Sequence, residues 1–114
     1  MVCGTRDQAL KVLQQSAEAL QSWVSIHPND PLAWGALAQG EEAMGQRLRA
    51  MRAQAEARAA VGDINGAIDR LRAAQSLVRS GGANDFIEAS IIDARLRQLE
   101  AMRLAITAEL RGGK

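Results

Sequence analysis

Two glycines, Gly45 and Gly62, stand 17 residues apart in the middle of the chain. Glycine readily takes the left-handed conformation that ends many helices, and the chain can reverse direction there. A break every 17 residues is half of 34, a period at which some repeat proteins place one pair of helices. The spacing therefore predicts short antiparallel helices that pack as neighbours in sequence order.

The segments between these breaks carry apolar residues at three- and four-residue spacing, the pattern of an amphipathic helix. Five helices are expected: 7–26, 31–44, a third that continues through Ala59, a fourth from the cap Asp63 through Val78, and 86–110. Aromatic residues make up 3% of the chain and Tyr is missing, so strands have little material to form from. We predict an all-α fold of antiparallel hairpins with a long C-terminal helix, arranged as a closed bundle or as a solenoid.

The helical domain is expected to span residues 7–110. Residues 1–6 are expected to be a disordered or artificial terminus, and residues 111–114 a frayed tail. No run approaches the roughly 20 apolar residues of a bilayer span, and the N-terminal segment lacks the continuous apolar region of a signal peptide.

The segment HPNDPLAW, residues 27–34, holds both prolines, the only histidine and one of the two tryptophans. Pro28 removes a backbone donor and disfavours the helical conformation at His27, so the first helix must end there. Asp30 can accept a first-turn amide, and Pro31 suits the first helical position. The segment therefore predicts a boundary between helix pairs.

The tetratricopeptide repeat has the 34-residue period. With Pro31 as its first position, the motif's residue classes match at Trp34, Leu37, Ala38, Gly45, Ala50 and Ala57. Glu41 and Gln54 depart from the motif, which prefers large apolar residues there. A second frame, shifted by half a repeat, places suitable residues at Gly62, Ala67, Leu71 and Ala74, so the third helix belongs to both frames. These matches predict one good repeat with degenerate flanks in a solenoid.

The segments SIHPNDPLAWGALAQGEEAMG, RAQAEARAAVGDINGAIDRLRAAQSL and IIDARLRQLEAMR occur in this order over about two-thirds of the chain. This ordered set resembles the C-terminal repeat domain of bacterial periplasmic M48 zinc metalloproteases of the β-barrel assembly-enhancing type. The resemblance implies a parent protein with an N-terminal HExxH protease part, and repeats that contact that protease and the outer-membrane assembly machinery. It also implies a periplasmic location. The chain has no protease part and resembles an excised domain.

Catalysis by this chain is not expected. A zinc protease needs two histidines one helical turn apart and a further ligand, whereas His27 is the only histidine here. Cys3 has no fixed base nearby in the sequence, so a catalytic cysteine is not expected either. No phosphate-binding GxxxxGK[ST] segment occurs. We expect no cofactor in this chain, and zinc only in the protease part implied by the resemblance.

The charges are balanced, with 13 acidic and 14 basic residues, which argues against nucleic acid as a partner. Ion pairs within helices are expected between Arg52 and Glu56, between Asp69 and Arg72, and between Asp93 and Arg97. Asp85 is predicted to cap the last helix, with Glu88 as its capping-box partner.

Protein partners are therefore the leading expectation. In the tetratricopeptide family, ligands commonly contact first-helix residues on the concave face. Across the two frames, the candidate partner-binding residues are Leu32, Gln39, Glu42, Arg49, Arg52 and Glu56. The alternative is a stand-alone α-helical scaffold or chaperone-like dimerisation module. A homodimer of the isolated chain is plausible because Leu13, Leu20 and Val24 form an apolar stripe that requires a cover.

Overall fold

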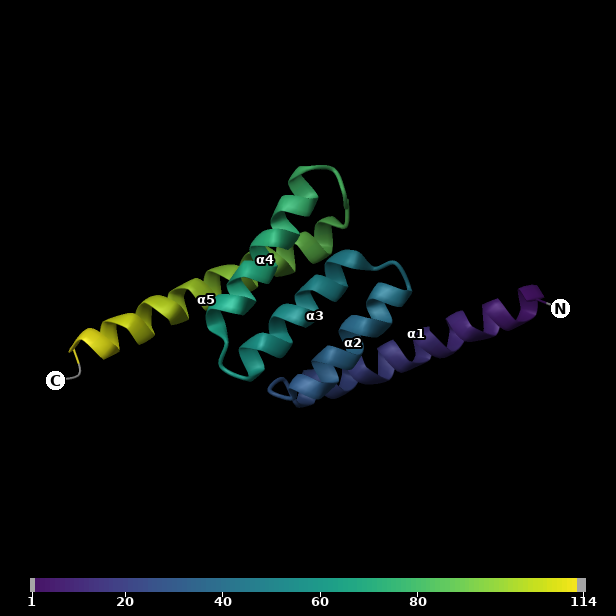
Figure 1. Ribbon diagram of the computed structural model, residues 1–114, viewed down its shortest axis with the longest axis horizontal. Helices are drawn as coiled ribbons and strands as arrows, with labels where there is room; N and C mark the ends of the chain where they lie inside the picture. Colours follow the sequence, from purple (N-terminus) through teal and green to yellow (C-terminus); the bar gives the residue numbers. More distant parts are fainter. Residues whose placement is uncertain (1, 113–114) are drawn as a thin grey trace.

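The computed structural model of the protein describes residues 2–112, with side chains from residue 5 onward. These residues form α1 (Val2–Ile26), α2 (Pro31–Ala43), α3 (Arg47–Ala60), α4 (Ile64–Arg79) and α5 (Phe86–Gly112), and they include no strand. The all-α prediction is confirmed. Consecutive helices run in opposite directions (Figure 1). Each helix packs on the next one in the sequence, and α3 also contacts α5.

The helical part is longer than expected at both ends. Residues 2–6, expected to be disordered, belong to α1, and Arg111 and Gly112, expected to fray, belong to α5. Neither segment contains a proline, so the helical hydrogen bonds continue through both of them. Residues 1, 113 and 114 lie outside the described part. None of the five helices is long and apolar enough to cross a membrane.

Glycines with positive φ end the three middle helices, at Gly45, Gly62 and Gly81. At Gly62, the Asp63 amide donates to the Arg58 carbonyl at 2.9 Å and the Gly62 amide donates to the Ala59 carbonyl at 3.0 Å. These two bonds form a Schellman motif, which satisfies the last carbonyls of α3. The Asp63 carboxylate then caps α4 by accepting from the Gly66 amide at 2.9 Å. One short link thus ends a helix and starts the next, as the spacing predicts.

Both tryptophans fasten the turn between α1 and α2. The Trp23 indole donates to the Asp30 carboxylate at 2.8 Å, and the Trp34 indole donates to the Pro28 carbonyl at 2.8 Å. Asp30 also accepts from the Ala33 amide, which caps α2. The Trp23 bond, followed by the Ala33 bond, holds the pKa of the Asp30 carboxyl below its usual value. His27 stacks on Trp23 with ring centroids 3.9 Å apart. The crowding in HPNDPLAW therefore builds a rigid helix boundary.

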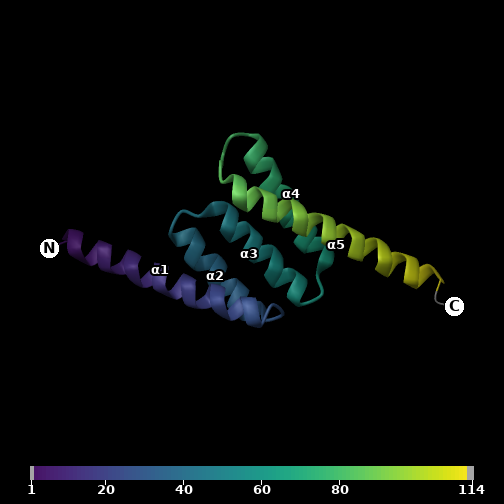
Figure 2. The ribbon, with the colours of Figure 1, turned by 180° about the vertical axis from the view of Figure 1, so that it is seen from behind.

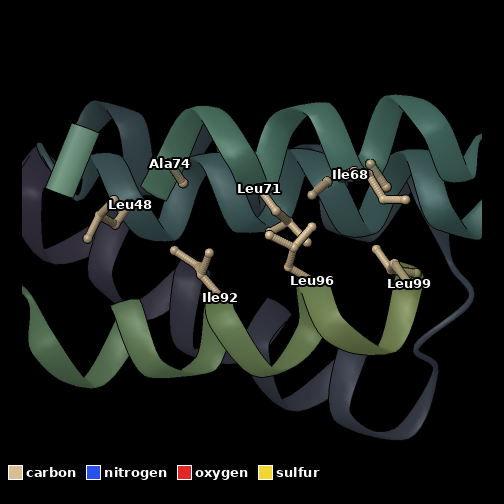
Figure 3. Close-up of a cluster of buried hydrophobic side chains, with 9 residues drawn as sticks. Leu48, Ile68, Leu71, Ala74, Ile92, Leu96 and Leu99 are labelled. Carbon is tan, nitrogen blue, oxygen red and sulfur yellow. The ribbon is translucent and has the colours of Figure 1, made fainter. Parts of the chain in front are cut away.

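Two apolar clusters lie on opposite sides of α3. The first joins α1, α2 and α3 through Ala17, Val24, Ala33, Trp34, Leu37, Ala38 and Ala53. The second joins α3, α4 and α5 through Leu48, Ala55, Ala67, Ile68, Leu71, Ala74, Ile92, Leu96 and Leu99. Figure 3 shows Leu71 of α4 facing Leu96 of α5 in this second cluster. The third helix therefore contributes residues to both clusters.

The stack is elongated, with extents of 68 × 31 × 18 Å and a radius of gyration of 16.3 Å. A compact domain of this length would have a radius of gyration of about 13 Å. The difference arises because α1 and α5, of 25 and 27 residues, are much longer than the inner helices. Their outer halves project at opposite ends of the molecule (Figures 1 and 2).

The Gly62 reversal provides a test of the stacking. Gly62 has φ +86°, and a Cβ added there would meet nothing within 4 Å, so only the backbone conformation opposes a larger residue. We expect Gly62→Ala to lower the free energy of unfolding by about 1–2 kcal/mol. Gly40→Ala is the matched control, because Gly40 lies inside α2 with equally open space. Alanine should raise stability there by up to about 1 kcal/mol. Urea denaturation of both variants measures the two changes in the free energy of unfolding. Equal changes would contradict the assignment of Gly62 to a left-handed helix end.

Candidate functional site

A polar cleft of about 540 Å³ opens between α1 on one side and α3 with the start of α5 on the other. The C-terminal turn of α2 contributes Glu41 and Met44. The remaining lining residues are Gln14, Ala17, Glu18, Gln21, Gln46, Arg49, Arg52 and Glu88. The cleft exists because α1 contacts only α2 among the described helices, whereas α3 and α5 contact each other directly. We call this feature the α1–α3–α5 cleft.

Ion pairs hold α3 against α5 at the edge of the cleft. Arg52 of α3 pairs with Glu88 in the first turn of α5, and both side chains are largely buried. One turn further along α3, Glu56 accepts two bonds from the Arg95 guanidinium, at 2.8 and 2.9 Å. Two-bond pairing of this kind fixes orientation as well as distance. The pairs therefore set the position of α5 relative to α3.

Asp85 places the start of α5 by accepting from the Glu88 amide at 3.0 Å. The predicted capping box is only half formed, because the Glu88 carboxylate turns to Arg52 instead of the Asp85 amide. The expected ion pairs within helices are also wrong. Among the described residues, Arg52 and Glu56 each pair with α5, and Arg72 pairs with Glu100 of α5. Asp93 accepts from Gln75 of α4. These side chains therefore pair between helices, and not within one helix as expected.

Arg52 connects the cleft to the first apolar cluster. Its guanidinium carbon lies 6.0 Å from the centroid of the Trp34 ring, within the range of a cation–π contact. The same guanidinium pairs with Glu88. Arg52 is thus held from two sides.

Glu41 is the unusual residue of the cleft. Its side chain is 5% exposed, and its Oε2 atom has no hydrogen-bond partner among the described residues. Burial raises the pKa of the Glu41 carboxyl, because a charged group loses hydration there. Glu88 adds to the increase in pKa, and Arg49 and Arg52 oppose it. An unpaired carboxyl oxygen in a buried position reduces stability.

The candidate residues named from sequence separate into three groups. Arg49 and Arg52 line the cleft. Glu56 is committed to Arg95 and is not among the lining residues. Leu32 and Glu42 are exposed on α2 outside it, and Gln39 lines a second, shallower groove of about 440 Å³ between α2 and α4. The remaining residues of this second groove are Gly35, Ala38, Gln54, Ala57, Arg58, Val61, Asp63 and Arg70.

Sequence reasoning missed Glu41 as a site residue, although it identified Glu41 as a departure from the repeat motif. That departure is the signal that could have found the site, because a carboxylate at a position for a large apolar residue must be buried. Gln14, Glu18 and Gln21 were missed because no residue of α1 had been matched to the repeat motif. The predicted apolar stripe on α1 is partly covered: Val24 is buried against α2, and Leu20 packs beside it.

No group of three His, Cys, Asp or Glu side chains in the described part is arranged to hold a metal ion. Comparison of the chain with protein-family models, with curated proteins and with solved structures finds no significant match.

The pairing of Glu56 with Arg95 gives one test of this architecture. We expect Glu56→Gln to lower the free energy of unfolding by about 2 kcal/mol, since a part-buried charged bond is lost. Glu100→Gln is the control, because the Glu100 side chain is 36% exposed, against 12% for Glu56. It should cost less than about 1 kcal/mol. Chemical denaturation of both variants at pH 7 measures the difference, and a larger loss in the Glu100 variant would refute the ranking.

The raised pKa of Glu41 makes stability depend on pH. Below about pH 4 the carboxyl is protonated in both states and carries no penalty. As pH rises, the unfolded chain releases the Glu41 proton first, so the contribution of Glu41 to stability falls until the folded pKa is passed. We expect Glu41→Gln to be more stable than the wild type at neutral pH, by of order 1 kcal/mol, and the gain to shrink towards pH 4. Denaturant titrations across this range test it; a gain independent of pH would rule out the ionisation of Glu41 as its cause.

Proposed function

We propose that the chain is a non-catalytic, tetratricopeptide-like interaction domain that binds protein partners in the α1–α3–α5 cleft. The observation that carries the proposal is the double role of α3, which packs on α2 through one cluster and on α4 and α5 through the other. In a repeat stack each helix contacts mainly its sequence neighbours, and the surface on one side of the stack is left open. That open surface is here a polar cleft.

The half-shifted repeat frame agrees with the position of the cleft. In that frame α3 is the first helix of one repeat. The first helix of the preceding repeat is α1, and the first helix of the following repeat is α5. The cleft is lined mainly by these three helices. Its predicted contact residues Arg49 and Arg52 are both among the lining residues. The other frame would use the shallower groove that includes Gln39.

We further propose, from the resemblance described above, that this domain serves the C-terminal part of an M48-type metalloprotease in outer-membrane protein assembly. The partners would then be the protease domain and components of the assembly machinery, and the location the periplasm. This step goes beyond the architecture, because many repeat proteins share the same stacking.

Exposed apolar side chains favour one alternative, a dimerisation module. The outer half of α5 exposes Met102, Leu104, Ile106 and Leu110. The outer half of α1 exposes Leu10 and Val12. Such surfaces often mark contacts between proteins, including copies of one chain.

Site-specific photocrosslinking separates these functions. A photoreactive residue would be placed at Gln46 in the cleft, at Gln39 in the second groove, and at Ile106 on the outer half of α5. The labelled chain would be expressed in the organism that encodes it, and adducts identified by mass spectrometry. We expect a discrete heterologous adduct from position 46 and a weaker one, or none, from position 39.

The identity of each adduct decides between the proposals. An M48 protease domain or an outer-membrane assembly component at position 46 supports the full proposal. A different protein supports the interaction domain and rejects the protease connection. An adduct of the chain with itself from position 106, with none from position 46, would replace the proposal with the dimerisation module.

A further inference from the structure

We propose that the α1–α3–α5 cleft recognises a basic side chain, a lysine or an arginine of a partner polypeptide, which donates to the free carboxylate oxygen of Glu41. The inference rests on the proposed function, since it names the chemistry of the ligand that the cleft takes. It depends on one residue and can be tested separately.

The first argument is the unmet hydrogen bond. The Glu41 side chain is 95% buried, lines the cleft, and has an Oε2 atom without a donor. Buried polar atoms in native proteins nearly always have a partner, so an exception requires an explanation. A donor supplied by a bound partner would satisfy this oxygen. A cationic donor is the best match, because it also compensates the charge that burial makes costly.

The second argument concerns the cations already present. Arg52 forms a close ion pair with Glu88. The Arg49 Nε atom lies 4.0 Å from the Asp85 carboxylate. Both lining arginines therefore have other carboxylate neighbours. Neither donates a hydrogen bond to the Oε2 atom of Glu41.

The third argument is the balance of charge in the cleft. Its acidic lining residues are Glu18, Glu41 and Glu88, and its basic ones are Arg49 and Arg52. After the pairing of Arg52 with Glu88, and with Arg49 beside Asp85, the charges on Glu18 and Glu41 remain. These two carboxylates come from α1 and α2. A basic side chain that enters the cleft can compensate this negative charge.

The cleft suits a side chain better than a lone ion. The amides of Gln14, Gln21 and Gln46 line it and can bond to the backbone of an extended segment. Its volume of about 540 Å³ accommodates more than one residue. A metal ion would need several oxygen ligands converging on one point, and no such group occurs in the described residues.

The test uses the whole chain, labelled with ¹⁵N and titrated with two matched peptides. One is the acetylated and amidated heptapeptide Gly-Ser-Ala-Lys-Ala-Ser-Gly, and the other has norleucine in place of lysine. Norleucine keeps the four side-chain carbons of lysine and lacks its charged ammonium group. We expect saturable shifts of the backbone amides of Gln14, Gln21 and Glu41 with the lysine peptide, and affinity at least about tenfold weaker for norleucine.

Glu41→Gln and Glu42→Gln form the matched pair of variants. Each removes one negative charge from adjacent positions of α2, but Glu42 is exposed and outside the cleft. We expect Glu41→Gln to weaken binding of the lysine peptide at least about tenfold and Glu42→Gln to leave it within about twofold. Circular dichroism confirms that both variants are folded.

Three results would overturn the inference. Equal binding of the two peptides would show that the cleft holds peptides without reading charge, which leaves the proposed function standing. Equal weakening of lysine-peptide binding by both variants would show that the net charge of the protein, and not the position of Glu41, determines the affinity. If neither peptide shifts the amides of the cleft, the proposal of a basic ligand is wrong. The proposed function is then tested independently by the crosslinking experiment at position 46.

Discussion

The close packing of α3 between its neighbours is the constraint on which the rest of the structure depends. Ala50, Ala53 and Ala55 are almost completely buried, and their small size lets helices approach on both sides. With its apolar surface fully used, α3 presents arginine and glutamate side chains towards α5. These form the two ion pairs that hold α5 in place. A helix rich in small and charged residues thus serves as the centre of two cores.

The cleft follows from an asymmetry in that arrangement. On one side of α3, the pairs of Arg52 and Glu56 draw α5 into direct contact. On the other side, α1 contacts α2 alone among the described helices, and the space between α1 and α3 stays open. Glu88, which fixes α5 by pairing with Arg52, also occupies the guanidinium of one of the two arginines that line the cleft. The Oε2 atom of Glu41 is left without a donor among the described residues.

Local signals were sufficient to predict the helices and their breaks. Gly45 and Gly62 need positive φ, and Asp30, Pro31 and Asp63 act within one turn of the backbone they cap, so their effects can be read from spacing alone. The ion pairs could not be predicted in this way. Arg52 has Glu56 within reach along its own helix, yet it pairs with Glu88, 36 residues away. The choice depends on how α5 lies against α3, and helical spacing carries no information about that.

The same reasoning explains why the sequence pattern points to Arg49 and Arg52 of the cleft but not to Glu41. Arg49 and Arg52 were named because a repeat frame assigns them to a concave face, whereas Glu41 was treated as a mismatch. A mismatch with a packing motif has physical content: a carboxylate in an apolar position lowers stability, since its hydration is lost without compensation. Natural proteins break such packing rules mainly at functional or strained sites. Of the two departures from the repeat motif, Glu41 lines the cleft and Gln54 lines the second groove, so each departure lies at an open surface of the molecule.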